Sequence, residues 1–339
     1  MQTSQLFKVQ LLFLIFSISL TADEIYLKFD QKLMDADWSF LPEVPTAFKE
    51  NTYTSKEIGF TFKNIKASYK SSEIDLQLQR STEPKDVALY ADKEDIKIGY
   101  LYNEKHYLYL LSSEQLADPQ AFNCYEFGTF ILGSCDQADL QISSSNPKYD
   151  VLGDNIISIA GNADSYGVGY QRYFNNFWIS SSKIEIINTN YSYNWLSPLE
   201  DIKSPFLLNL SVNGVILGDA LTTALERLPQ RTDWESLQLN IGIKQKFISI
   251  YNFNLITEYD LVLLEFSDYR EYKNTPKYNF RLRAGVEFYV ENLSLLFYGD
   301  AYLNNLIGFE PITFNQRTEH YFDKPYGELG LKFKLKLKF

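Results

Sequence analysis

The sequence is poor in the side chains that most often carry out catalysis or bind metal ions. Its 339 residues include only two histidines, two cysteines and two methionines. Nucleophilic hydrolysis needs a nucleophile beside a base, and His106 with Ser112 or Ser113 is the one triad-like combination. A histidine without catalytic duty is far more common, so we predict no catalytic residue, no metal site and no cofactor.

The sequence also lacks a long apolar run. After Ala22 no stretch of about 18 apolar residues occurs, which excludes a protein that crosses a membrane with helices. A membrane barrel remains allowed, because its strands carry apolar residues only at alternate positions.

Basic residues are outnumbered by acidic ones. The chain has 32 Lys and Arg against 43 Asp and Glu, a formal charge of −11, so nucleic acid is not expected as a partner. Aromatic residues, in contrast, make up 16% of the chain, which suits the aromatic girdles of a membrane barrel.

The amino-terminal segment predicts export. Lys8 precedes an apolar or hydroxyl-bearing run over 11–20, and Ala22 is followed by two acidic residues. This is the outline of a secretory signal peptide over 1–22, cleaved near Ala22. The run is too short to span a bilayer, although an amino-terminal membrane anchor is the alternative.

Cys124 and Cys135 lie in a segment rich in Asn, Gly, Ser and Asp. In an oxidising compartment the pair is expected to form a disulfide that closes one loop. Zinc is disfavoured, since no histidine lies near the two thiols. Free thiols are the alternative.

Alternation of apolar and polar residues recurs along most of the chain. The carboxyl terminus, over 329–339, reads LGLKFKLKLKF, and the segment 278–288 is a second clean stripe. A strand repeats every two residues, so each segment has one apolar and one polar face. Short turns such as Glu291-Asn292 contrast with long polar connections at 114–125, 143–163, 188–205 and 303–325.

The sequence resembles bacterial outer-membrane β-barrel proteins in its signal segment, its alternating segments and its terminal LKLKF. The resemblance implies an all-β fold, a transmembrane antiparallel up-and-down barrel of about 12–14 strands with long external loops. It implies that Leu335, Leu337 and Phe339 act as an insertion signal for the barrel-insertion machinery. Outer-membrane lipids and small solutes are the other expected partners, and the oligomeric state stays open.

The predicted organisation is a signal peptide (1–22), an amino-terminal segment (23–52) and a barrel (53–339). The segment 23–52 is a periplasmic lead-in, a lumen plug or a first strand built on Ile25-Tyr26-Leu27. Near 244–246 the alternation changes phase, and either a turn or a bulge explains it. The pattern over 219–228 predicts a short helix before Pro229.

A porin-like channel for small hydrophilic solutes is the predicted function. If odd terminal positions face lipid, the lysines at even positions form a row along the lumen at about 6.6 Å spacing. A cation row opposite an anion row creates a field that discriminates among ions. The predicted pore-lining residues are Lys332, Lys334, Lys336, Lys338, Arg281, Arg283, Glu73, Asp75 and Glu287. A closed structural or adhesive barrel and an outer-membrane lipid-modifying enzyme are the alternatives.

Overall fold

The computed structural model describes residues 23–34, 51–78, 87–123, 155–174, 178–196, 211–212, 215–216, 231–267, 277–304, 308–309 and 326–339. The chain forms two compact units, of which the first comprises Met1–Leu116, Ala163–Asn190 and Glu235–Phe339. The segment 1–22, Cys124, Cys135, His320 and the helix expected over 219–228 lie outside the described residues. The expectations about them therefore stay predictions.

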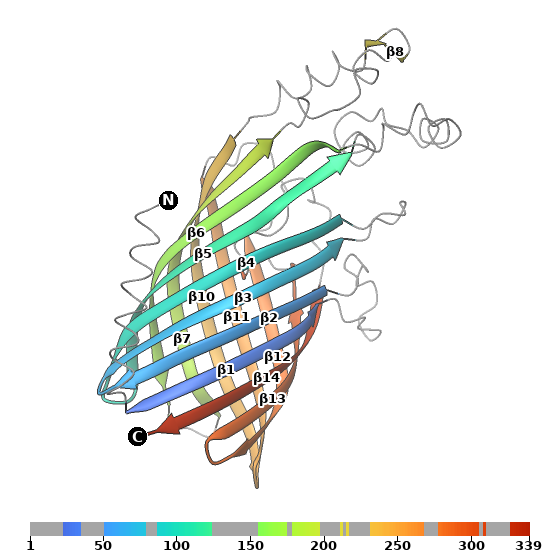
Figure 1. The fold of residues 1–339 in the computed structure, drawn as a ribbon. Helices are drawn as coiled ribbons and strands as arrows, with labels where there is room; N and C mark the ends of the chain where they lie inside the picture. The colour runs from blue at the N-terminus through green and yellow to red at the C-terminus, as the bar shows by residue number, and fades with distance from the viewer. Residues whose placement is uncertain are drawn as a thin grey trace. The chain divides into compact units, whose positions relative to one another are not determined.

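Twelve strands within the described residues form a closed antiparallel barrel. Their order is β1-β14-β13-β12-β11-β10-β7-β6-β5-β4-β3-β2, so β1 lies beside β14 and closes the wall (Figure 1). The wall strands are β1 (Glu24–Met34), β2 (Asn51–Phe62), β3 (Ile65–Leu78), β4 (Val87–Tyr102), β5 (His106–Asn123), β6 (Asn155–Tyr173), β7 (Ile179–Leu196), β10 (Arg231–Ile250), β11 (Phe253–Ser267), β12 (Tyr278–Val290), β13 (Leu293–Tyr302) and β14 (Tyr326–Lys338). The predicted fold class is confirmed.

The prediction that the barrel starts at residue 53 is wrong. Strand β1 belongs to the wall, with Glu24 opposite Lys338 on one side and Thr61 on the other. Its alternation of apolar and polar residues gives it the same two faces as β14, which allows it to close the wall. Of the three readings of 23–52, the first-strand one holds for Glu24–Met34.

In the described part of the chain, the short turns join β2 to β3, β4 to β5, β10 to β11 and β12 to β13. They lie at one end of the barrel, because every second connection of an antiparallel wall lies at the same end. The turn residues Lys63, Asn103, Tyr251 and Glu291 have positive φ angles between 46° and 52°. The predicted Glu291-Asn292 turn is among them. The strand ends that the longer connections join lie at the opposite end of the barrel, as outer-membrane barrels arrange them.

Two details of the strands refine the expectations. The phase change near Lys246 is a bulge, since the register between β10 and β11 shifts between Lys246 and Ile248 and the chain turns only at Tyr251. Strands β5, β6 and β7 extend into 114–123, 155–163 and 188–196, where connections were expected. Those residues continue the extended backbone of their own strands.

The second compact unit comprises Ala117–Asn162 and Tyr191–Trp234. It contains a small hairpin in which β8 (Ser211–Val212) pairs with β9 (Val215–Ile216). No helix in the described part of the chain is long and apolar enough to cross a membrane.

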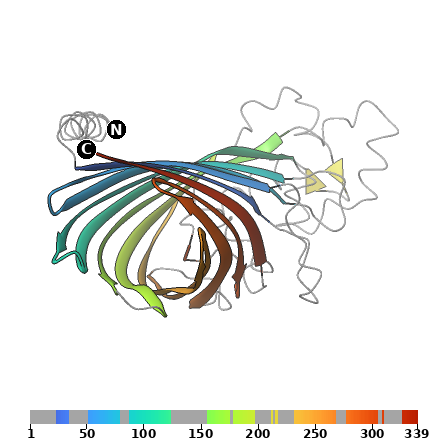
Figure 2. The ribbon, with the colours of Figure 1, turned by 90° about the horizontal axis from the view of Figure 1, so that it is seen from below.

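The two faces of the wall differ as the alternation predicts. Along β12 the side chains of Tyr278, Phe280 and Leu282 are exposed to the outside, whereas Asn279 and Arg283 are buried inside. The wall can be followed in Figure 2 from β1 to β14. An apolar outer face around a polar interior defines a transmembrane barrel.

Candidate functional site: the barrel lumen

The inner face of β12, β13, β14 and β1 is held by cross-strand ion pairs. Arg283 donates two hydrogen bonds to the Asp300 carboxylate, both at 2.7 Å. Lys32 Nζ lies 2.8 Å from a Glu328 oxygen, and Lys332 of β14 pairs with Asp30 of β1. Paired groups of this kind compensate one another's loss of hydration.

Tyrosine rings reinforce the wall by lying over glycines of the next strand. Tyr298 covers Gly330 and donates a 2.6 Å hydrogen bond to Asp30, which also lies 3.0 Å from Lys332 Nζ. A Cβ atom at Gly330 would collide with the tyrosine ring. Strands β13 and β1 are therefore connected across β14.

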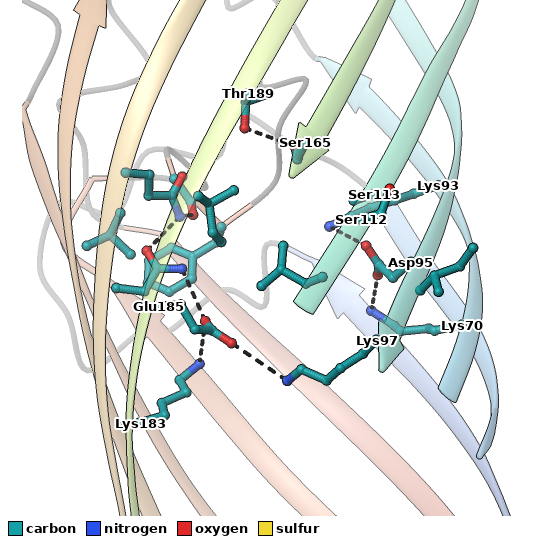
Figure 3. A pocket seen from close by; sticks show the side chains of 18 of the residues that line it. Lys70, Lys93, Asp95, Lys97, Ser112, Ser113, Ser165, Lys183, Glu185 and Thr189 are labelled. Carbon is teal, nitrogen blue, oxygen red and sulfur yellow. Dashed lines mark hydrogen bonds and ion pairs between the residues drawn. The ribbon is translucent and has the colours of Figure 1, made fainter. Parts of the chain in front are cut away.

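The same arrangement recurs on the opposite side. Tyr109 of β5 covers Gly169 of β6 and donates a 2.6 Å hydrogen bond to Glu185 of β7. Lys97 of β4 and Lys183 of β7 approach this carboxylate at 3.7 and 3.6 Å (Figure 3). The Lys97–Glu185 pair therefore spans two intervening strands.

Lys183 continues the network towards β12. Its Nζ lies 3.0 Å from Asp260 of β11, which also accepts a close hydrogen bond from Arg281. Arg281 in turn lies 3.8 Å from Asp300. Ion pairs thus connect both sides of the lumen through β11 and β12.

Two cavities lined by described residues lie between these side chains. The larger has a volume of about 380 Å³ and mixes charged, hydroxyl, amide and apolar groups. Figure 3 shows one part of it, with Ser165 and Thr189 on one side and Asp95 between Lys70 and Lys93 on the other.

The smaller cavity has a volume of about 270 Å³ and a more uniform lining. Its charged lining residues are seven cations and two carboxylates: Lys28, Lys32, Lys70, Lys93, Arg281, Arg283, Lys332, Asp30 and Glu57. The two cavities adjoin, since they share the lining residues Glu57, Lys70, Lys93, Arg281 and Phe309.

Gly308 and Phe309 of the connection between β13 and β14 contact the inner wall. Gln238 of β10 donates a 2.6 Å hydrogen bond to the Gly308 carbonyl. Gly308 has φ of +78°, and a Cβ there would collide with Val262 of β11. The Phe309 ring centroid lies 5.2 Å from that of Tyr302 and 5.6 Å from the Arg281 guanidinium. This pair therefore lies inside the wall, where an external connection was expected.

Most of the predicted pore-lining residues lie on the inner face. Arg281, Arg283 and Lys332 line the cavities. Lys334 lies 5.0 Å above the Tyr26 ring and Lys336 lies 3.3 Å from Glu24. Further along the same face, Glu287 accepts a hydrogen bond from Asn254, and Lys338 stands exposed at the rim.

The assignment of Glu73 and Asp75 to the lumen is wrong. Ser72, next to Glu73, bonds to the hydroxyl of Tyr53, and Tyr53 lines the smaller cavity. Because strand positions alternate, Glu73 and Asp75 lie on the outer face. Lys332 and Lys336 of the expected cation row instead pair with Asp30 and Glu24 of the adjacent strand β1, so a cation row opposite an anion row does not form.

The triad-like combination is not assembled. His106 Nδ1 lies 2.6 Å from the Tyr170 hydroxyl on the next strand. Ser112 and Ser113 lie further along the same strand as His106, about 20 Å away at 3.3 Å per residue.

The three predicted insertion-signal residues occupy the outer positions of β14 and its end, and Phe339 is 80% exposed.

Sequence reasoning missed the carboxylates that hold the lumen, namely Asp30, Asp260 and Glu328. The signal was present for β1, where Lys28, Asp30 and Lys32 alternate with apolar residues. No local pattern marks Gly308 and Phe309 as lumen residues.

A closed antiparallel wall with an apolar outside and a charged lumen defines the class, an outer-membrane-type β-barrel. No known protein-family model matches the sequence, and no curated protein matches it. Among solved structures, the translocator domain of autotransporter NalP from Neisseria meningitidis is similar, at a TM-score of 0.51 and 9% identity over 100% of this chain and 98% of that one.

The beta domain of the Bordetella autotransporter BrkA has a TM-score of 0.48 and 10% identity, over 92% of this chain and 99% of that one. LpxR from Salmonella typhimurium has a TM-score of 0.44 and 7% identity, over 91% and 99%. At 9% identity the likeness to the NalP translocator domain shows the fold alone, that of a bacterial outer-membrane β-barrel.

Proposed function

We propose that this protein is a porin-like channel of the outer membrane, through which small hydrophilic solutes diffuse. The observation that carries the proposal is the pair of adjoining polar cavities, about 380 and 270 Å³, inside the wall. Polar walls hold water, and an aqueous path is what a hydrophilic solute needs.

The passage is narrow. Phe309 and Arg281 line both cavities, so a solute moving between the cavities passes these two side chains. Lys183, Asp260 and Arg281 reduce the open cross-section further. Solutes of a few carbon atoms therefore suit the lumen better than oligomers.

Recording in planar lipid bilayers tests the proposal. Purified full-length barrel should insert and give discrete steps of conductance, because each insertion opens one aqueous path. Protein that migrates as a folded, heat-modifiable barrel yet stays silent over repeated insertions would contradict the channel.

A closed structural barrel is the second candidate, favoured by the ion pairs that cross the lumen. The Lys97–Glu185 pair connects strands that are not neighbours, and such ties rigidify a filled interior. The same recordings separate the two candidates, since a closed barrel gives no steps.

We propose no catalytic role. The hydroxyl that His106 contacts belongs to Tyr170, whose phenol is not the usual nucleophile of a lipid hydrolase. A release of fatty acid from outer-membrane lipids that depends on His106 would overturn this part of the proposal.

A further inference from the structure

Cations dominate the lining of the smaller cavity, and most of the carboxylates that pair with them lie outside the lining. Seven cations line the cavity. Among the described residues, five of the carboxylates that pair with these cations do not line it. These five are Asp95, Glu258, Asp260, Asp300 and Glu328.

Three of the five carboxylates, Asp260, Asp300 and Glu328, expose 5% or less of their side chains, whereas Asp95 and Glu258 expose 29% and 18%. Glu328 and Asp300 expose 1% and 0% of their side chains, whereas Lys332 and Lys28 expose 28% and 26%. A solute in the cavity therefore meets more cations than carboxylates in its lining, although the seven cations and the seven carboxylates that line the cavity or pair with them balance in formal charge. A cleft lined by one sign of charge concentrates the opposite ion.

The cations are also held in place before a ligand arrives. Arg283 is fixed by two hydrogen bonds to Asp300, and Lys32 by Glu328 from the wall side. Binding then costs little side-chain entropy, which is the main expense of ordering long basic side chains.

The cationic groups approach the cavity from several strands. Lys28 and Lys332 come from β1 and β14, Lys70 and Lys93 from β3 and β4, and Arg281 from β12. One carboxylate group is too small to reach them all. A molecule with two or three anionic groups matches this spread.

We propose that the smaller cavity binds a small organic polyanion, such as a polycarboxylate or a phosphate ester, on its way through the lumen. The inference rests on the proposed channel, because the ligand reaches the cavity through the lumen. It adds a substrate class that diffusion through a neutral pore would not select.

Calorimetric titration of citrate into the detergent-solubilised full-length barrel tests the site. Citrate should bind more tightly than acetate, and more weakly as sodium chloride rises. The double variant Lys28→Gln, Lys332→Gln should raise the Kd at least about tenfold, the loss expected for a charge-assisted hydrogen bond.

The matched control is Lys66→Gln, Lys246→Gln, which removes two inner lysines that line neither cavity. Its Kd should stay within about twofold of the wild type, because the lost charges lie outside the site. Equal weakening in both double variants, or citrate no tighter than acetate, would overturn the site. Heat-dependent gel mobility verifies the fold of each variant.

The two proposals fail in different ways. Citrate binding by a barrel that never conducts would sink the channel and keep the site. Conductance steps from a barrel that binds citrate no better than acetate would keep the channel and sink the site.

Discussion

The two sides of the lumen share the arrangement of a tyrosine ring over a glycine but differ in the size of the other side chains that face inwards. On the side of β12, β13, β14 and β1, large charged side chains fill the space and pair across strands, as Arg283 does with Asp300. On the side of β5, β6 and β7, small or hydroxyl-bearing residues such as Ser165, Gly169 and Thr189 face inwards. The larger cavity lies against Ser165 and Thr189, whereas the Tyr109 ring covers Gly169.

This difference separates two tasks of an inner wall. Paired charges fix the strands and set the electrostatic character of the lumen, while small side chains leave room for solute. Substitutions of the paired charged residues should therefore change the folding stability of the barrel or the ion preference of the lumen. Substitutions between the two sides should change the passage of solutes.

The largest effect is expected on the charged side. Asp300→Asn removes the carboxylate that holds Arg283 and leaves a buried guanidinium less well compensated. Folding stability, measured by denaturant unfolding in detergent, should fall by about 3–5 kcal/mol. Glu73→Gln, on the outer face, is the control and should change stability by less than about 0.5 kcal/mol. Equal effects would contradict the ion-pair account.

On the opposite side, Gly169→Ala places a methyl group against the ring of Tyr109. Overpacking of this kind costs about 1–3 kcal/mol. Tyr109→Phe keeps the ring but loses the bond to Glu185, and should cost about 1 kcal/mol. If Gly169→Ala left the folding stability unchanged in the same unfolding assay, the Tyr109 ring would not lie over Gly169 as described.

Between the two sides, Phe309→Ala should join the cavities more widely. Single-channel conductance is expected to rise on the order of twofold, because the narrowest section limits current. Phe297→Ala is a matched control, as that ring is 60% exposed on the outer face. A rise in both variants, or in neither, would remove Phe309 from the constriction.

The smallest effect concerns ion preference. Lys334→Glu with Lys336→Glu should move the reversal potential towards cation preference, by a few millivolts if the charges act near the mouth of a narrow path. Lys56→Glu, which lies on the outer face between the inner residues Ser55 and Glu57, should leave the reversal potential unchanged. An equal shift in both would assign the effect to surface charge.

The sequence predicted the faces of the carboxyl-terminal strands well, since Arg281, Arg283 and Lys332 point inwards as their alternation requires. It failed for Glu73 and Asp75. The alternation of apolar Ile74, Leu76 and Leu78 with polar residues predicts that the apolar side chains face lipid, but Ile74 lies opposite Tyr53 on the inner side. An apolar residue near the end of a strand that leads into a long connection can face the interior of the barrel and need not contact lipid.

The pairing within the lumen was beyond sequence reasoning. Asp30 contacts Lys332, and the two lie at opposite ends of the chain. Such contacts depend on the register between β1 and β14, for which a single sequence has no local signal. Phe309 is similar, because its place follows from contacts with β12 and β13 and from the hydrogen bond of its neighbour Gly308 to β10.

Solute entry into proteoliposomes tests the central claim most directly. Liposomes that contain the wild-type barrel are placed in an isosmotic solution of arabinose, a small uncharged sugar, and the change in turbidity is followed. The account predicts swelling with arabinose that slows strongly for a trisaccharide such as raffinose, because the passage beside Phe309 is narrow. Absence of arabinose-driven swelling, with the barrel shown to be folded and inserted, would contradict the open lumen.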